Sequence, residues 1–134
     1  MLTEIEKQLC QSAISARQNA YAPYSKFKVG VAILDEFGKM HLGVNVENAA
    51  YPQGSCAEAG AISAMILSGS KQIKLIAVSG GGLELCTPCG GCRQKIREFA
   101  SLEMPVLICN EKNFEKRFLL KTLLPVSFGP KNLF

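Results

Sequence analysis

The spacing of apolar and polar residues predicts helices and strands that follow one another along the chain. Over residues 3–20, apolar side chains recur every three or four positions, as they do on the buried stripe of an amphipathic helix. Pro23 disfavours helical dihedrals in the residue before it and ends this segment. The apolar runs 29–34 and 40–46 flank the turn DEFG, so the first part of the chain predicts a helix and an antiparallel hairpin.

The second part of the chain continues this alternation. Small and apolar residues over 56–67 predict a helix that stops near Gly69, and another helix is expected over 92–100. Short apolar runs predict three more strands, at 75–80, 105–110 and 116–121. Helices that alternate with strands after an opening hairpin predict the α/β class, as a three-layer α/β/α fold with a five-stranded mixed sheet.

Length and composition add bounds to this picture. The 134 residues are expected to form one domain, 1–134, because a single core serves a chain of about 100 to 150 residues. With 48% hydrophobic and 19% charged residues, the chain has the composition of a folded globular protein. The net charge of +4 comes from scattered Lys and Arg residues, so neither a nucleic-acid polymer nor a membrane is an expected partner.

The N-terminal residues and the cysteines indicate a cellular compartment. The stretch MLTEIEKQL lacks the apolar run of a secretory signal, and no stretch approaches the roughly 18 apolar residues of a membrane span. We therefore expect a cytoplasmic protein. In that reducing compartment the six cysteines are expected to be metal ligands or buried thiols rather than disulfides.

Three of these cysteines have the arrangement of a metal site. Cys89 and Cys92 form a C-x-x-C pair at the start of one predicted helix, and Cys56 stands at the start of another. Three thiolates with one open position suit a catalytic zinc, whereas a structural zinc is normally closed by a fourth protein ligand. Helix N-termini, with their unpaired N–H groups and positive dipole end, also favour thiolates over thiols.

Glu58 follows Cys56 by two positions and is the candidate catalytic residue. Within a regular helix, residues two apart point in nearly opposite directions, so the two side chains can share a site only if Cys56 lies at the helix cap. A carboxylate beside an open zinc position can take a proton from water and return it to a substrate. We therefore expect Cys56 to bind the metal and Glu58 to move protons.

The other cysteines and the glycines have simpler interpretations. A C-x-x-C pair alone is also typical of redox proteins, and Cys86 extends it to a run that resembles part of an iron–sulfur site. We expect Cys86 to be a bystander, although it remains an alternative ligand. Cys10 and Cys109 lie in apolar patterns and are expected in the core. The segment SGGGL lacks the ending of a phosphate loop and predicts a strand exit, and His41 is expected in a strand without a metal.

The pattern C-A-E followed by P-C-G-G-C resembles the zinc nucleoside and nucleobase deaminases, whose related pattern is H-x-E…P-C-x-x-C. Here Cys56 replaces the His of that pattern, and in this respect the chain resembles the small cytidine deaminases. The stretches YAPYSKFKVG, NVENAAYP, PCGGCRQ and LLPVSF occur in the order and approximate spacing of that family, over nearly the whole chain. The resemblance implies a cytidine deaminase-like fold.

The resemblance also implies roles for single residues. Asn45 and Glu47 would hydrogen-bond the ribose 3'-hydroxyl, although by pattern alone they are equally a solvated strand face. Phe27 would line the nucleoside pocket, and the Ala57 N–H would meet the pyrimidine carbonyl. Further positions would reach the pocket of a neighbouring subunit and imply a homotetramer; they are Ala49, Tyr51 and Phe128.

The implied reaction is the hydrolytic deamination of cytidine or 2'-deoxycytidine to the uridine counterpart and ammonia. It needs one Zn²⁺ per chain and no organic cofactor: water activated on zinc adds to C4 of the base, and Glu58 protonates N3 and then the leaving amino group. Many cysteine-type members carry Arg directly after the catalytic Glu, where it offsets the thiolate charge, but this chain has Ala59. Arg93, next to Cys92, is our candidate for that role.

Two other functions remain open at this level. A structural zinc module that binds a protein partner would need no Glu58 and would predict a closed four-ligand site. A deaminase acting on a nucleoside antibiotic or on a base within a polynucleotide would share the metal motif. The stretch NVENAAYP favours a nucleoside pocket, and the chain lacks an obvious basic groove for a strand.

Overall fold

The computed structural model describes residues 1–134, whose centre is one mixed sheet of five strands. Neighbouring strands follow the order β2-β1-β3-β4-β5. β3 and β4 run parallel, and every other neighbouring pair is antiparallel. The strand bounds are β1 Val29–Asp35, β2 Met40–Val44, β3 Ile73–Gly80, β4 Pro105–Cys109 and β5 Phe114–Leu119. The predicted five-stranded mixed sheet is confirmed.

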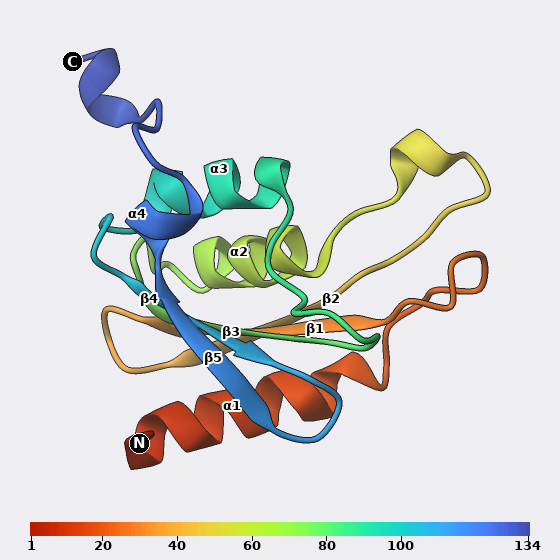
Figure 1. Ribbon diagram of the computed structural model, residues 1–134. Helices are drawn as coiled ribbons and strands as arrows, with labels where there is room; N and C mark the ends of the chain where they lie inside the picture. The colour runs from red at the N-terminus through yellow and green to blue at the C-terminus, as the bar shows by residue number, and fades with distance from the viewer.

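Helices cover both faces of this sheet (Figure 1). Helix α1 (Glu4–Arg17) packs on one face, and α2 (Ala57–Leu67) and α3 (Gly90–Phe99) lie side by side over the other. The short α4 (Leu120–Leu123) follows β5 next to α3. Two single turns, η1 (Tyr51–Gln53) and η2 (Pro130–Asn132), stand away from the body. The three-layer α/β/α prediction is therefore confirmed, and no helix has the length and apolar character needed to cross a membrane.

The alternation of strand side chains divides the apolar residues between two cores. In β4, Val106 and Ile108 face α2 and α3, while Leu107 and Cys109 face α1. Cys10 of α1 is buried in the same cluster as Cys109. The expectation that Cys10 and Cys109 are core residues is confirmed.

Several predicted boundaries were wrong. Helix α1 ends at Arg17 rather than at residue 20, because the chain turns there before it reaches Ala20. Helix α3 begins at Gly90 rather than at residue 92, since Cys89 already serves as its cap. The expected strand 116–121 is displaced to 114–119, and a turn of helix follows. Apolar runs of this length do not separate strand from helix by pattern alone.

Gly43 of β2 lets helix α2 approach the sheet at backbone distance. A Cβ atom placed on Gly43 would stand 2.2 Å from the Ala57 carbonyl oxygen and 2.3 Å from the Ala61 nitrogen. Gly30 of β1 gives α1 the same access, because its Cβ would lie 2.2 Å from the Ala13 oxygen. Contacts this short leave no room for a side chain. The first turn of α2, which carries Glu58, therefore rests directly on the backbone of β2.

His41 belongs to a buried polar cluster at the hairpin turn. Its Nε2 lies 2.7 Å from Oδ2 of Asp35, which also accepts a 2.6 Å hydrogen bond from the Ser70 hydroxyl. The backbone N–H groups of Phe37 and Lys39 donate to the other carboxylate oxygen. Although burial acts in the opposite direction, these bonds hold the pKa of Asp35 well below its usual value. The cluster fixes the end of the hairpin opposite the site described next.

Candidate metal centre and substrate pocket

Two cysteines occupy the N-caps of the two helices that lie side by side. Cys56 caps α2 with φ −83° and ψ 160°, and Cys89 caps α3 with φ −67° and ψ 170°. Both conformations are extended rather than helical. This confirms that Cys56 lies outside regular helical geometry, the condition under which Glu58 can share its site.

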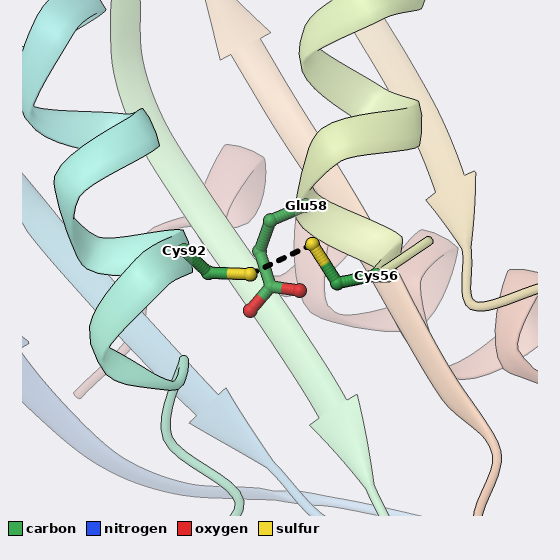
Figure 2. Close-up of side chains that lie close together, drawn as sticks. All are labelled: Cys56, Glu58 and Cys92. Carbon is green, nitrogen blue, oxygen red and sulfur yellow. Dashed lines mark hydrogen bonds between the residues drawn. The ribbon is translucent and has the colours of Figure 1, made fainter. Parts of the chain in front are cut away.

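Cys56, Glu58 and Cys92 come together between these helices (Figure 2). The Cys92 thiol points from α3 toward Cys56, with the two sulfur atoms 2.8 Å apart. One sulfur from each cysteine and a Glu58 carboxylate oxygen all lie within 4.8 Å of one another. Glu58 is only 4% exposed, and this burial raises the pKa of its carboxyl. The raised pKa suits a group that must both accept and return a proton.

Cys89 and Cys86 lie at the same cavity but differ in their surroundings. Backbone N–H groups, first that of Cys92, lower the pKa of the Cys89 thiol. Burial raises the pKa of the Cys86 thiol, whose side chain fills the space beside Gly80. Cys89 is not among the three residues within 4.8 Å of one another, so its role as a ligand stays a prediction. Its ease of ionisation nevertheless favours it over Cys86.

The cavity at this centre has a volume of about 250 Å³. It shares one lining residue with a second cavity. Phe27 and Ala57 line it beside the cysteines and Glu58. A neighbouring cavity of about 510 Å³ is lined by Glu47 and Tyr51, among others. Asn45 lines both. The site therefore offers a small compartment at the sulfur and carboxylate groups and a larger, more polar one beside it.

Asn45 and Glu47 are held by the chain around them rather than lying free on a strand face. The Asn45 amide accepts from the Val29 N–H at 2.8 Å and donates to the Phe27 carbonyl at 2.8 Å, leaving one donor and one acceptor site. The Glu47 carboxylate accepts from the Tyr24 and Ser25 N–H groups at 2.9 and 3.1 Å and from the Ser25 hydroxyl. These bonds, the hydroxyl's first, lower the pKa of Glu47. The carboxylate is ionised and oriented before any ligand arrives.

The residues expected to reach a neighbouring subunit lie apart from one another. Tyr51 stands on η1, exposed, with its ring centre 6.0 Å from that of Tyr24. Ala49 is exposed just before it. Phe128 is 57% exposed and lies in the C-terminal segment, on the opposite side of the molecule from η1 (Figure 1). Within one chain, Phe128 lines neither of the two cavities.

Arg93 has partners that the sequence did not indicate. Its guanidinium donates to the Pro88 and Leu123 carbonyl oxygens and to the Thr87 hydroxyl, and to none of the cysteine sulfurs. The expected offset of thiolate charge by Arg93 therefore stays a prediction without a direct contact. Lys95, two residues further along the same helix, is the cation whose charge lowers the pKa of Glu58, against the larger effect of burial.

The sequence analysis did not single out every residue of the site. For example, Val29 and Thr87 line the inner cavity, and Tyr24 and Ser25 hold Glu47. Tyr24, Ser25 and Val29 lie within YAPYSKFKVG, and Thr87 directly precedes PCGGCRQ. The Tyr24 and Ser25 contacts include backbone N–H groups, which a motif does not show.

The donor set fits a thiophilic metal. Cysteine sulfur is a soft ligand that favours zinc over magnesium or calcium. Cys56, Cys92 and the nearby Cys89 would hold zinc, with the Glu58 carboxylate facing the remaining position. The residues present therefore fit a zinc centre with one open side.

Comparison with known proteins agrees with this interpretation. The sequence model of the cytidine and deoxycytidylate deaminase zinc-binding region matches residues 3–108. The cytidine deaminase of Sporosarcina psychrophila is 39% identical over 97% of this chain and 95% of its own length. The probable cytidine deaminase of Dictyostelium discoideum is 36% identical over 97% of this chain and 87% of its own.

Solved structures show the same likeness. The crystal structure of cytidine deaminase from Burkholderia pseudomallei superposes with a TM-score of 0.86 at 36% identity, covering 95% of this chain and 100% of that one. That of cytidine deaminase from Mycobacterium tuberculosis gives a TM-score of 0.77 at 35% identity, over 92% and 96% of the two chains.

The third metal ligand can be identified by replacing one cysteine at a time with serine. We expect Cys89→Ser to weaken zinc binding by at least about 100-fold, more than the loss of an outer hydrogen-bond partner costs. Cys86→Ser, the matched control at the same cavity, should leave the affinity unchanged. Zinc content after dialysis against a graded chelator measures both. Loss of zinc from Cys86→Ser alone would instead make Cys86 the ligand.

Proposed function

This chain belongs to the cytidine and deoxycytidylate deaminase family, and from that membership we infer that it hydrolyses cytidine to uridine and ammonia. We extend the inference to 2'-deoxycytidine, which differs only at a hydroxyl that no assigned residue contacts. The observation that carries the proposal is the pair of cavities that share Asn45. The inner one suits a flat base at the reactive centre, and the outer one suits its sugar.

Substrate binding follows from the groups that line these cavities. Phe27 offers an apolar ring to the base. Ala57 is the first residue of α2, so its N–H has no intrahelical partner and can donate to the pyrimidine carbonyl. Asn45 and Glu47 can hold the 3'-hydroxyl with the donor and acceptor sites that their own contacts leave free. The prior contacts of both side chains reduce the entropy cost of binding.

Glu58 is proposed to carry protons in the reaction. When bound, zinc supplies the positive charge that makes a water molecule acidic near neutral pH. Glu58 would accept that proton and pass it to N3 of the base as the oxygen adds to C4. It would then take the remaining proton from the new C4 hydroxyl and give it to the amino group, so that the C4–N bond breaks, ammonia leaves and the C4 carbonyl forms. Its burial excludes bulk solvent, which would otherwise exchange with the transferred proton.

We further propose that residues 1–134 act as one deaminase domain in the cytoplasm. A single sheet and the two cores beside it include every long helix and strand, which supports one folding unit. All six cysteines are free thiols, a state that the reducing cytoplasm maintains.

We also propose a homotetramer in which neighbouring chains complete each pocket. The C-terminal segment that holds Phe128 and the turn η1 that holds Tyr51 extend from different sides of one chain (Figure 1), and Phe128 lines neither cavity of its own chain, so we expect it to reach the substrate of another copy. Large exposed aromatic side chains are typical of surfaces that meet a partner.

The reaction is tested by the ultraviolet absorbance of cytidine mixed with zinc-loaded protein. We expect conversion to uridine by the unmodified chain and a loss of kcat of about 10²- to 10⁴-fold in Glu58→Gln, the usual contribution of general acid–base catalysis. Both proteins should hold one zinc per chain. If neither converts cytidine while both hold zinc, the substrate is wrong, and nucleoside antibiotics and single-stranded DNA are the substrates to assay.

The role of Glu47 can be tested with a substrate that lacks the 3'-hydroxyl to which Glu47 is proposed to bond. Glu47→Gln should lower kcat/KM for cytidine by about 10- to 100-fold, the value of one hydrogen bond to a charged group. The same substitution should matter much less for 2',3'-dideoxycytidine, which has no 3'-hydroxyl. 2'-Deoxycytidine, which keeps it, is the control. An equal loss on all three substrates would assign Glu47 to the support of the loop at Tyr24 and Ser25 instead.

Shared pockets predict complementation between two defective chains. Glu58→Gln and Phe128→Ala should each have low activity alone. Mixed after mild dissociation, they should regain activity, because some pockets then combine an intact Glu58 with an intact Phe128 from a neighbour. Sedimentation equilibrium should give the mass of four chains. A monomeric mass, or no gain on mixing, would contradict the proposal.

A further inference from the structure

Arg93 connects two segments that are distant in sequence. Its Nε donates to the Pro88 carbonyl at 2.6 Å, and its Nη2 donates to the Thr87 hydroxyl at 2.9 Å. Its Nη1 donates to the Leu123 carbonyl at 2.6 Å. The side chain thus folds back from the first turn of α3 onto the residues that precede that helix, and also reaches the end of α4.

The segment that Arg93 holds has little structure of its own. No helix or strand occurs between Gly80, the end of β3, and Gly90, the start of α3. Within this stretch the Thr87 N–H bonds the Leu85 carbonyl, and Pro88 has no N–H to donate. Pro88 is buried, so its carbonyl needs a partner within the protein. Arg93 provides that partner.

The other end of the connection lies in the main core. Leu123 is the last residue of α4, and its carbonyl has no partner within that helix. Leu120 and Leu123 are buried in the cluster beneath α2 and α3. A guanidinium at this carbonyl both caps α4 and connects the loop to residues packed in the main core.

We propose that Arg93 is a positioning residue that holds the loop of Thr87, Pro88 and Cys89 against the end of α4. Through this loop it sets the place of the Cys89 thiol and of the Thr87 wall of the inner cavity. This role rests on the proposed function only in taking Cys89 as a zinc ligand. It differs from an offset of thiolate charge, because it depends on the planar, three-way geometry of the guanidinium and not on its charge alone.

Two substitutions separate geometry from charge. Arg93→Lys keeps the positive charge, but a lysine cannot bond the loop and the end of α4 with the planar geometry of a guanidinium. Arg93→Gln removes both the positive charge and the guanidinium geometry. Arg97→Gln is the matched control, since Arg97 lies one turn later on α3 and bonds the Ser127 hydroxyl but not the metal loop. Thr87→Val removes a single acceptor with little change of shape and serves if the Arg93 variants fold poorly.

The first measurement is the rate at which zinc passes to a colorimetric chelator. We expect release about 10- to 100-fold faster from Arg93→Gln and nearly as fast from Arg93→Lys, the usual effect of losing an outer partner of a metal ligand. Thr87→Val should change the rate in the same direction but less. Arg97→Gln should match the unmodified protein. Restoration of slow release by Arg93→Lys would overturn the proposal in favour of a charge role.

The second measurement is amide hydrogen exchange over residues 82–89 in the metal-free protein. Both Arg93 variants should exchange faster there than the unmodified chain and Arg97→Gln. Unchanged exchange would overturn the proposal even if zinc release were altered. Neither readout requires turnover of cytidine, so a failure of the proposed reaction and a failure of this role are distinguishable.

Discussion

The meeting of two helix N-termini over one end of the sheet is the constraint on which the site depends. Cys56 and Cys89 are both capping residues with extended dihedrals, and both line the inner cavity. Cys92, one turn inside α3, then comes within 2.8 Å of Cys56. Positive helix ends, thiols and a buried carboxylate are concentrated there because the helices lie side by side. Ala57 and Glu58 lie in the first turn of α2, and the other groups proposed to bind the substrate, Phe27, Asn45 and Glu47, lie in the loops at this end.

The sequence predicted the centre of the site better than its surroundings. The two-residue spacing of Cys56 and Glu58 required a cap, and the structure has one. Arg93 illustrates what could not be predicted, because its acceptors are carbonyl groups whose positions depend on the loop and on α4. The same holds for Glu47, whose partners include backbone N–H groups of Tyr24 and Ser25 as well as the Ser25 hydroxyl. Motifs identify side chains, whereas these contacts depend on the path of the backbone.

The fold was predictable where a strand is a continuous apolar run and less so where two short elements follow each other. Strands buried on both faces, such as β3 and β4, gave continuous apolar runs that were placed to within two residues. The strand β5 was also displaced by two residues, and the helix after it was missed, since a six-residue strand and a four-residue helix follow each other without a turn residue. A helix of one turn has too few positions to show a period.

The absence of a side chain at Gly43 affects which amino-acid substitutions the core can accept. Because α2 rests on the β2 backbone at Gly43, a rigid main-chain contact sets the height of its first turn above the sheet. Apolar side chains such as Met65 and Ile96 belong to the core beneath the helices and are not part of this contact. A substitution among them acts on the first turn of α2 only through side-chain packing, whereas any side chain at position 43 would collide with that turn directly. The part of the helix that carries Glu58 therefore depends on a residue of β2 that contributes no side chain.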